Sequence, residues 1–274
     1  MNKIDLKGKR ALVTGGSQGI GARICKELAS CGADIVVNYF TNKEKAEILV
    51  EELKNSFHIN AWAVGANVSK SVQVKQMFKY LDNTMGGIDI LINNAGSEST
   101  FHVLDLEESE WDRVININLK GPFLCAQEAG RRMEKNGGGV IINISSIHDT
   151  LPRKGLTHYC VAKGGLKMLS KCLALELAES NIRVISVAPG AIETELNRKE
   201  IAAFGVGKFE KWIPSGRLGQ VQDVSPTIAF LCSDMASYIT GTEVYIDGAY
   251  MLSTVQYDPR PERKKDGINL LRNG

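Results

Sequence analysis

The chain has 274 residues, of which 43% are hydrophobic and 23% charged, which is the composition of a globular protein with a sizeable core. A formal net charge of +2 is too small to indicate nucleic acid, and no apolar run approaches the about 18 residues of a membrane span, so we expect neither as a partner. Six scattered cysteines and four distant histidines show no metal-ligand spacing, so we expect reduced thiols, no metal site and a cytoplasmic protein.

Apolar runs of strand type alternate with helical patterns through nearly the whole chain. Most of the runs are continuous stretches of Val, Ile and Leu, which is typical of strands covered on both faces. This order predicts a single α/β domain with a doubly wound parallel sheet of about seven strands and helices on both faces. The strands are expected at 10–14, 34–39, 61–68, 89–95, 139–145, 182–188 and 242–247, and the helices include 42–55, 70–84, 110–135 and 158–178.

A glycine-rich turn follows the first expected strand and opens into a helix. In TGGSQGIG, Gly15, Gly19 and Gly21 stand where the backbone has to bend sharply and approach a ligand without a Cβ in the way. The helix offers free N–H groups to a pyrophosphate, and this position in the first βα unit is typical of a Rossmann-type dinucleotide site. A purely structural turn is the alternative. A Walker A loop is excluded because no Gly-Lys-Ser/Thr follows.

Tyr159 and Lys163 lie four residues apart in the helix expected at 158–178. That spacing places a phenol and an ammonium on one face of the helix, one above the other. The pair is either an ordinary surface contact or acid–base machinery, and the helix alone does not decide between the two. The same helix carries a leucine stripe at helical spacing, formed by Leu166, Leu169, Leu173 and Leu177.

Six short motifs occur in a consistent order along the chain. They are TGGSQGIG, NNAG at 93–96, NINLKG with Asn118, INISS with Ser146, YCVAK, and PGAIET at 189–194. The chain therefore resembles the short-chain dehydrogenases/reductases over residues 6–249, and within them the bacterial glucose 1-dehydrogenase-like subgroup. The resemblance implies an NAD(P)(H)-dependent oxidoreductase that interconverts a secondary alcohol and a ketone, or a sugar hemiacetal and its lactone.

Four catalytic residues follow from the resemblance. Tyr159 is expected to be the general acid/base, with its ordinary pKa of about 10 lowered by the Lys163 ammonium and the oxidised nicotinamide. Lys163 is also expected to bind the nicotinamide ribose, Ser146 to hold the substrate oxygen, and Asn118 to support a proton-relay water. The alternatives are an exposed Tyr–Lys pair, a turn serine and a capping asparagine.

The resemblance also implies a set of cofactor contacts. Asn94 is expected to pack behind the cofactor, and Thr194 to bond the nicotinamide carboxamide beside Ile192. Asn67 stands where the family more often has an Asp that holds the adenine amino group, and its carbonyl is expected to accept that hydrogen bond. The full set is Gly15, Ser17, Gln18, Gly19, Ile20, Tyr39, Phe40, Thr41, Asn67, Val68, Asn94, Ala95, Gly96, Tyr159, Lys163, Pro189, Gly190, Ile192 and Thr194.

The junction after the second strand indicates which dinucleotide is bound. An acidic residue there favours NAD by bonding the 2′-hydroxyl, whereas a basic residue favours NADP. Tyr39 occupies the position of the acidic residue that selects NAD, and Phe40 occupies the most common position of a basic residue. Gln18 occupies the position where many NADP enzymes have Arg or Lys. Because no acid excludes a 2′-phosphate and residues 41–43 are available to contact it, NADP is favoured over NAD.

Three residues are expected to meet the small-molecule substrate besides Ser146 and Tyr159. Glu98, His148 and Asn197 match places that meet the sugar in the glucose 1-dehydrogenase-like subgroup. A carboxylate and an imidazole suit a polyhydroxylated substrate, because sugar hydroxyls need several directional partners. A surface Glu and a loop His are the alternative. Two further interpretations stay open: a reductase of 3-oxoacyl thioesters or other ketones, and a catalytically silent dinucleotide-sensing regulator.

Three segments depart from that subgroup. PRKGL at 152–156 is more basic, a small lid expected around 195–213 differs at most positions, and a longer basic tail follows at 252–274. Residues 1–251 are expected to form one dinucleotide-binding and catalytic domain that contains the lid. The resemblance implies a homotetramer formed through the two longest helices, with the leucine stripe at the contact.

Overall fold

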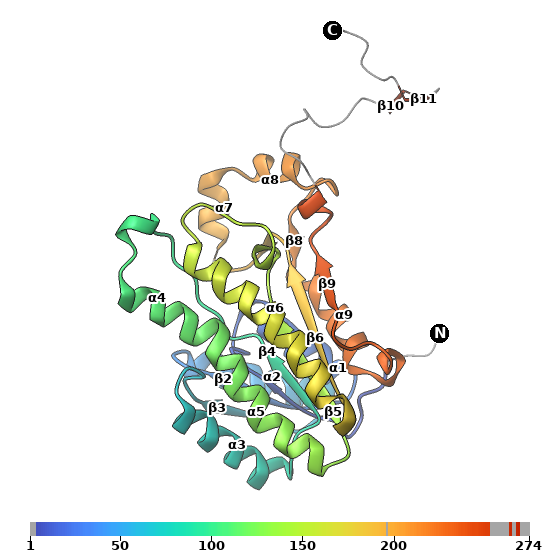
Figure 1. Cartoon of the computed structure of the whole chain (residues 1–274). Coiled ribbons are helices and arrows are strands. Elements are labelled where there is room, and N and C mark those ends of the chain that lie inside the picture. Colours follow the sequence, from blue (N-terminus) through green and yellow to red (C-terminus); the bar gives the residue numbers. More distant parts are fainter. Residues whose placement is uncertain (1–3, 196, 253–262, 265–266, 269–274) are drawn as a thin grey trace.

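A seven-stranded parallel sheet runs through the molecule (Figure 1). The computed structural model describes residues 4–195, 197–252, 263–264 and 267–268. The strand order β3-β2-β1-β4-β5-β6-β9 confirms the predicted doubly wound sheet. Its strands are β1 Arg10–Val13, β2 Asp34–Tyr39, β3 Ala61–Gly65, β4 Ile90–Asn93, β5 Gly139–Ile144, β6 Ile182–Pro189 and β9 Glu243–Ile246.

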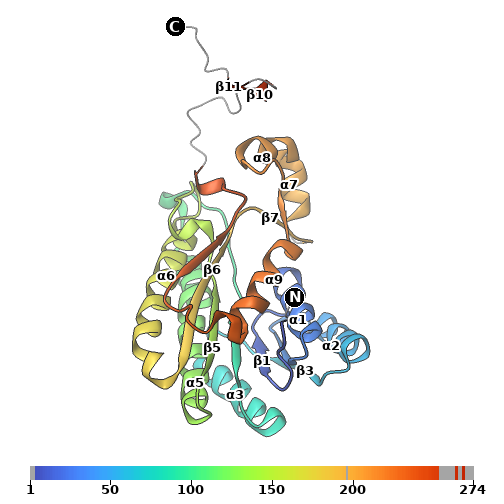
Figure 2. The same ribbon diagram turned by 90° about the vertical axis from the view of Figure 1, so that its right-hand side faces the viewer.

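Helices cover both faces of this sheet (Figure 2). Side chains of α1, α2 and α9 form one core cluster with the sheet, and side chains of α3, α5 and α6 form the other. The helices are α1 Gly19–Ser30, α2 Lys43–Phe57, α3 Ser71–Met85, α4 Glu108–Ile115, α5 Gly121–Lys135, α6 Thr157–Leu177, α7 Arg198–Phe204, α8 Val206–Trp212 and α9 Val221–Cys232. Short helical turns are η1 Val103–Asp105, η2 Asn116–Lys120, η3 Ile147–Asp149, η4 Ala178–Ser180, η5 Asp234–Ala236 and η6 Tyr250–Leu252.

The continuous apolar runs arise because each strand is buried on both faces. In β2, Ile35 and Val37 belong to the cluster under α1, α2 and α9, whereas Val36 between them belongs to the opposite cluster. Side chains alternate between the two faces of a strand, so burial of both faces requires an apolar residue at every position. The buried sheet therefore explains why these strands show no polar alternation.

The helix expected at 110–135 is interrupted. It divides into α4, the π-helical turn η2 and α5. Pro122 lies in the first turn of α5 and has no N–H to offer the carbonyl of Asn118, so an uninterrupted α-helical ladder is not possible there. Because π turns are frequent at functional sites, the break marks Asn118 as a residue of interest.

Three of the four leucines in the α6 stripe contact the core of their own chain, which the helix sequence alone does not predict. Leu166 is buried, and Leu173 and Leu177 pack against the core cluster shared with α3 and α5. The apolar face of the helix is therefore used by its own sheet. The apolar side chains that α6 does expose recur every seven residues and are Val161, Met168 and Leu175.

Helices α7 and α8 occupy the segment expected to form a lid, above the carboxyl ends of the sheet strands (Figure 1). Ile201, Ile213 and Leu218 form a small buried cluster with neighbouring partly buried side chains, separate from the two clusters of the main core. The two-residue strands β7 Ile192–Glu193 and β8 Gly219–Gln220 pair at the base of this segment. The lid segment is thus joined to the sheet through its own small core.

The basic tail expected at 252–274 lies outside the described residues, apart from Leu252 and two short strands. These strands, β10 Arg263–Lys264 and β11 Gly267–Ile268, pair antiparallel with each other. None of the helices in the described ranges combines the length and the apolar character that crossing a bilayer requires.

Ala249 adopts a backbone conformation that favours glycine, with φ at 69°. A residue with a Cβ in the left-handed region costs about 1–2 kcal/mol, while glycine loses about 0.5–1 kcal/mol more entropy on folding. We therefore expect Ala249→Gly to raise the free energy of unfolding by about 0.5–1 kcal/mol, measured by urea denaturation.

Ala178→Gly is the matched control, because Ala178 has an ordinary helical φ of −59°. There the substitution is expected to lower the free energy of unfolding by about 0.5–1 kcal/mol. Equal destabilisation by both substitutions would show that Ala249 is not strained.

Candidate active site

The ends of β1 and β4 are joined by the side chain of Thr14. Its hydroxyl donates to the carbonyl of Ile92 at 3.2 Å and accepts from the backbone N–H groups of Asn94 and Ala95, each at 3.0 Å. Thr14 is a structural member of the site that we did not predict, although it is the first residue of the TGGSQGIG motif. The join fixes the NNAG segment beside the glycine-rich turn.

The glycine-rich turn approaches NNAG too closely for larger residues. A Cβ on Gly15, which has a φ of 60°, would lie 2.9 Å from the Cα of Ala95, and one on Gly21 would clash with the Asn94 amide. The Asn94 amide donates to the carbonyls of Thr14 at 3.0 Å and Gly15 at 3.1 Å. Asn94 thus lies directly behind the turn, as the sequence predicts.

The start of α1 is suited to a phosphate group. Its N-cap residue Gln18 makes no capping hydrogen bond with its side chain, and the first turn contains no acidic residue. The first N–H groups of the helix are therefore left for an anion, which the positive end of the helix dipole also favours. Together with the absence of Cβ atoms at Gly15 and Gly21, these features fit the pyrophosphate of a dinucleotide.

The segment after β6 lies against this turn. Pro189 ends β6, and a Cβ on Gly190 would lie 2.7 Å from the Cβ of Asp247. Ile192 is buried, and Thr194 lies 3.8 Å from the position of a Cβ on Gly19. A groove of about 560 Å³ contains Ser17, Gln18, Gly19 and Thr194 among its lining residues, and Ile20 packs against the core next to it. The structure therefore brings these expected cofactor contacts together.

The end of β2 has no carboxylate. The ring of Tyr39 packs on Gly65, where a Cβ would lie 3.2 Å from the ring. Phe40 is 67% exposed, and the Gln18 carbonyl accepts a hydrogen bond from the Asn42 amide at 3.1 Å. Thr41 is also exposed.

The carbonyl of Asn67 is already occupied, which revises its expected role. It accepts from both the N–H of Ser69 at 2.9 Å and the hydroxyl of Ser69 at 2.7 Å. Because both lone pairs of the Asn67 carbonyl oxygen are used, Asn67 would contact an adenine through its amide N–H groups. The neighbouring Val68 is buried and packs against Gly121, where a Cβ would lie 2.9 Å from the Val68 side chain.

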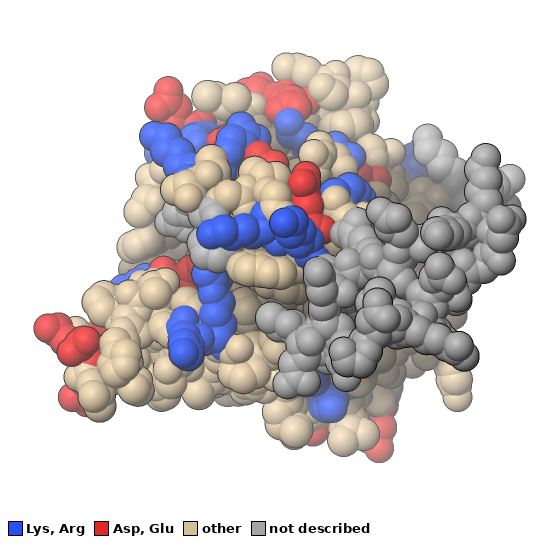
Figure 3. Space-filling view, turned by 90° about the horizontal axis from the view of Figure 1, so that it is seen from above, with Lys and Arg blue, Asp and Glu red and all other residues tan. Residues whose placement is uncertain are grey.

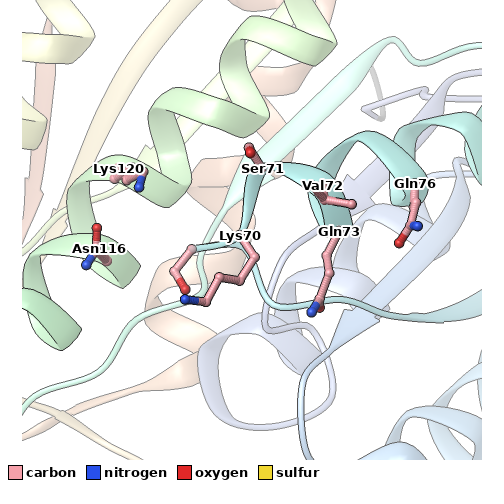
Figure 4. Close-up of a pocket in the computed structure, with 8 residues that line it drawn as sticks. Lys70, Ser71, Val72, Gln73, Gln76, Asn116 and Lys120 are labelled. Atoms are coloured by element: carbon pink, nitrogen blue, oxygen red, sulfur yellow. The ribbon is translucent and has the colours of Figure 1, made fainter.

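A hollow of about 590 Å³ lies between the start of α3 and the turn η2 (Figure 4). Lys70 and Ser71 at the start of α3 form one side, and Asn116 and Lys120 of η2 form the other. Tyr159 and Ser146 are not among its lining residues, so concavity alone does not identify the active site.

Tyr159 and Lys163 meet on the first turns of α6. The Nζ atom of Lys163 lies 5.5 Å from the centroid of the Tyr159 ring and donates to the carbonyl of Ile144 at 2.8 Å. Ser146, which follows β5, lies close enough to Tyr159 for its side chain to act on the pKa of the phenol. The spacing of four residues and the carboxyl end of β5 therefore bring the predicted triad together.

Burial dominates the protonation of this triad. It raises the pKa of Tyr159, and the negative charge of Glu98 raises it further, while the hydrogen bond with Ser146 acts in the opposite direction. Burial likewise lowers the pKa of Lys163 to about 8. In the chain by itself, the expected lowering of the Tyr159 pKa is therefore not found, because desolvation of the phenolate outweighs the nearby ammonium.

Asn118 links the site to the segment that follows NNAG. Its amide donates to the carbonyls of Ser97 at 2.7 Å and Val114 at 2.9 Å, and its carbonyl accepts from the N–H of Ser97 at 3.3 Å. A Cβ on Gly96 would lie 3.0 Å from this carbonyl oxygen. Both amide hydrogens are used, so the side-chain amide has no donor left for the expected relay water.

Of the three expected substrate residues, His148 contacts Tyr159 and Glu98 acts on it through its charge. The ring of His148 lies 6.4 Å from that of Tyr159, centroid to centroid, at an angle of 74°. Its Nδ1 pairs with the carbonyl of Leu151 at 2.9 Å; since a carbonyl only accepts, Nδ1 carries the hydrogen and Nε2 is an acceptor. The charge of Glu98 acts on Tyr159, Lys163 and His148 alike.

The side chain of Asn197 hydrogen-bonds the backbone just before α7. Its carbonyl accepts from the N–H of Thr194 at 2.7 Å, and its amide donates to the carbonyl of Ile192 at 2.8 Å. The structure thus gives this side chain a role in holding the turn after β7, and does not direct it to the substrate as we expected.

A buried ionic cluster lies behind Ser146. Asp149 and Glu243 have side chains that are 0% and 6% exposed, and Lys167 contacts them at 3.4 Å and 2.5 Å. Ser145 donates to Asp149 at 2.7 Å, and Ser186 donates to Glu243 at 2.9 Å. Burial and the hydrogen bond with Glu243 raise the pKa of Asp149. The pairing of β5 with β6 and of β6 with β9 brings these carboxyls together, so no local signal in the sequence predicts the cluster.

Within the described residues, no group of three His, Cys, Asp or Glu side chains is arranged to hold a metal ion. Lys and Arg side chains gather on the upper face around the lid (Figure 3). The lid helices contribute Arg198, Lys199, Lys208 and Lys211.

A family model described as Enoyl-(Acyl carrier protein) reductase matches residues 15–251. The 3-oxoacyl-[acyl-carrier-protein] reductase of Staphylococcus epidermidis is 40% identical over 240 residues, which are 88% of this chain and 98% of that protein. The 3beta-hydroxysteroid dehydrogenase 1 of Eggerthella lenta is 39% identical over 250 residues, which are 90% of this chain and 95% of that protein.

Solved structures show the same similarity. A short-chain type dehydrogenase/reductase from Mycobacterium marinum has a TM-score of 0.85 at 36% identity and covers 90% of this chain and 97% of its own. A gluconate 5-dehydrogenase from Burkholderia cenocepacia, in complex with NADP and tartrate, has a TM-score of 0.86 at 34% identity and covers 92% of this chain and 98% of its own. The predicted family and reaction class are thereby confirmed: the chain belongs to the short-chain dehydrogenase/reductase family, whose members are NAD(P)-dependent oxidoreductases that interconvert alcohols and ketones.

Proposed function

We propose that the protein is an NADP(H)-dependent dehydrogenase/reductase of a sugar or polyol, with Tyr159 as the general acid/base. The observation that supports the proposal most directly is the convergence of Tyr159, Lys163 and Ser146 at the carboxyl end of β5, with the ring of His148 against Tyr159 and the charge of Glu98 acting on it. Membership of an enzyme family sets aside the interpretation as a catalytically silent regulator.

The chain's own residues account for the proton chemistry. A bound nicotinamide supplies the hydride acceptor or donor. The Ser146 hydroxyl holds the substrate oxygen, and the Tyr159 oxygen takes the proton of an alcohol during oxidation or gives a proton to a carbonyl oxygen during reduction. The ammonium of Lys163 favours the phenolate form of Tyr159, which is otherwise disfavoured by burial.

Glu98 and His148 support a substrate with several hydroxyl groups. A carboxylate only accepts hydrogen bonds, and His148 Nε2 is an acceptor as well, so both suit hydroxyl donors. A negative charge beside Tyr159 also disfavours a substrate with an anionic group near the reacting carbon. These two features favour a neutral sugar or polyol.

Reduction of a 3-oxoacyl thioester is the second candidate. Relatives that share 40% of residues with this chain are named 3-oxoacyl-[acyl-carrier-protein] reductases. The basic lid helices support the same alternative, because an acyl carrier with an acidic surface is attracted by positive charge. Acetoacetyl-coenzyme A is the small substrate that tests this alternative.

The preference for NADP over NAD is part of the proposal. No carboxylate stands at the end of β2, so nothing there repels a 2′-phosphate. Lys43 pairs with Glu47 at 3.5 Å, but both side chains are well exposed and such pairs are weak. Lys43 therefore remains available to a phosphate beside Thr41 and Asn42.

We retain three further expectations as proposals: a cytoplasmic location, a single domain over 1–251 with its lid at 195–213, and a homotetramer. The exposed apolar side chains of α6 support assembly through this helix, since Leu175 is 81% exposed. The mass of the protein in solution decides between a monomer and a tetramer.

Tyr159→Phe is expected to lower kcat by at least about 100-fold, because it removes the proton donor and acceptor. The measurement is the change in reduced-nicotinamide absorbance with a panel of sugars, polyols and small ketones. Tyr238→Phe is the matched control, since Tyr238 is fully exposed on the surface. An undiminished rate for Tyr159→Phe would remove Tyr159 from its proposed role, and wild-type turnover of acetoacetyl-coenzyme A alone would favour the second candidate.

Phe40→Asp is expected to lower kcat/KM for NADP by at least about tenfold, because a carboxylate repels the 2′-phosphate. The value of kcat/KM for NAD, which has no 2′-phosphate, is expected to stay nearly unchanged. The side chain is exposed, so the substitution does not disturb the core. Phe40→Asn is the uncharged control. If the Asp and Asn variants lose NADP activity equally, charge at this position does not select the cofactor.

The free energy of unfolding of the cofactor-free protein is expected to depend on Lys163 at alkaline pH. Burial lowers its pKa from 10.5 to about 8. Between these values the unfolded chain holds a proton that the folded chain has lost, so the wild type gains stability relative to Lys163→Met as the pH rises, by at most about 3 kcal/mol. Urea denaturation at pH 7.5 and 10.5 measures the difference, with Lys171→Met, exposed on the same helix, as the control. A difference that stays constant or shrinks with pH contradicts the expectation.

A further inference from the structure

Glu98 lies between two anchored neighbours in the chain, although its own side chain makes no hydrogen bond with any of the described residues. The residue before it, Ser97, accepts a hydrogen bond at its hydroxyl from Arg113 at 2.6 Å, and its backbone pairs with Asn118. The residue after it, Ser99, contacts Glu110 and His158 through its hydroxyl. An otherwise exposed carboxylate thus lies between two anchored serines.

The hydrogen bonds of Ser99 run in one direction. Arg113 donates to both carboxylate oxygens of Glu110, at 2.7 Å and 2.6 Å, and lowers the Glu110 pKa to about 2 together with Ser99. An ionised carboxylate only accepts, so the Ser99 hydroxyl donates its hydrogen to Glu110. The Ser99 oxygen then accepts from Nε2 of His158, which lies 2.9 Å away.

This direction fixes the state of His158. Its Nε2 carries the hydrogen, and its Nδ1 is a buried atom without a hydrogen-bond partner among the described residues. A second proton on Nδ1 would leave a buried charged N–H group without an acceptor, and burial accordingly lowers the pKa of His158. His158 is therefore neutral and serves as a fixed donor to Ser99, one residue before Tyr159.

The segment after Ser99 lies against the loop that leads into α6. Phe101 donates its backbone N–H to the carbonyl of Gly155 at 3.0 Å, and a Cβ on Gly155 would meet the side chain of Thr100. The anchored segment therefore spans from Asn118 to the first turn of α6, and Glu98 lies within that span, where its charge acts on Tyr159 and His148.

We propose that Ser99, His158 and Glu110 are positioning residues that act through Glu98: they hold its carboxylate against the substrate and so select substrates with an additional hydroxyl group. This inference rests on the proposed function, since it assigns Glu98 to substrate binding beside Tyr159. None of the three positioning residues touches the reacting atoms. Their effect is therefore on KM for polyhydroxylated substrates and not on the chemical step.

The test compares Ser99→Ala with wild type on the polyol that turns over best and on a simple secondary alcohol with one hydroxyl group. We expect KM for the polyol to rise about tenfold, which corresponds to about 1.4 kcal/mol, and kcat to change by less than about threefold. KM for the simple alcohol is expected to stay unchanged. His158→Leu should reproduce this pattern, and Ser99→Thr, which keeps the hydroxyl, should restore the wild-type KM.

A double-mutant cycle with Glu98→Ala identifies the path of the effect. If Ser99 acts through Glu98, Ser99→Ala has no further effect on KM in the Glu98→Ala background. Ser180→Ala is the matched control, because Ser180 also donates to a glutamate, Glu134 at 3.1 Å, at the opposite end of α6. Ser180→Ala should change neither KM nor kcat.

Three results would overturn the inference. An unchanged KM in Ser99→Ala, or an equal rise in KM with and without Glu98, shows that Ser99 does not position this carboxylate. A fall in kcat with both substrates shows a general structural role. If the wild type turns over the simple alcohol but no polyol, the proposed substrate class itself fails, and the inference fails with it.

Discussion

The site depends on the join between the ends of β1 and β4. These strands are neighbours in the sheet although Thr14 and Asn94 are 80 residues apart in the sequence. The join lies where the strand order reverses, which is where open α/β sheets bind ligands at their carboxyl edge. Because Gly15 and Gly21 have no Cβ, the glycine-rich turn packs directly on NNAG. Gly96, the last residue of NNAG, lies against Asn118. NNAG therefore connects the glycine-rich turn with Asn118.

The elements that could be predicted are those with a local physical signal. Burial on both faces gave β2 its continuous apolar run at 34–39, and the four-residue spacing on a helix placed Tyr159 beside Lys163. The break in the helix at 110–135 was missed because a π turn has no simple residue pattern, although Pro122 was a usable signal. The inward direction of the α6 leucines followed from the packing of the sheet, which the helix sequence does not contain.

The polar partners of the site could not be predicted in this way. Asp149 meets Glu243, and Ser99 meets His158, only after distant segments have been brought together by the sheet. For Asn67 and Asn197, the residue type suggested a free amide group, whereas the folded chain already uses part of that group in its own turns. A similar competition governs Tyr159, whose ionisation depends on burial as much as on its cationic neighbour.

The separate small core beneath the lid has a consequence for motion. Ile201, Ile213 and Leu218 form a cluster apart from both main clusters, so movement of α7 and α8 does not open the main core. Local opening with a low free energy is characteristic of such peripheral units, and it leaves the hydrogen bonds of the central strands intact. Backbone amides of the two lid helices would therefore exchange with solvent deuterium through local opening, well before those of β4 and β5. Opening of this segment would then leave the strands and their carboxyl ends undisturbed.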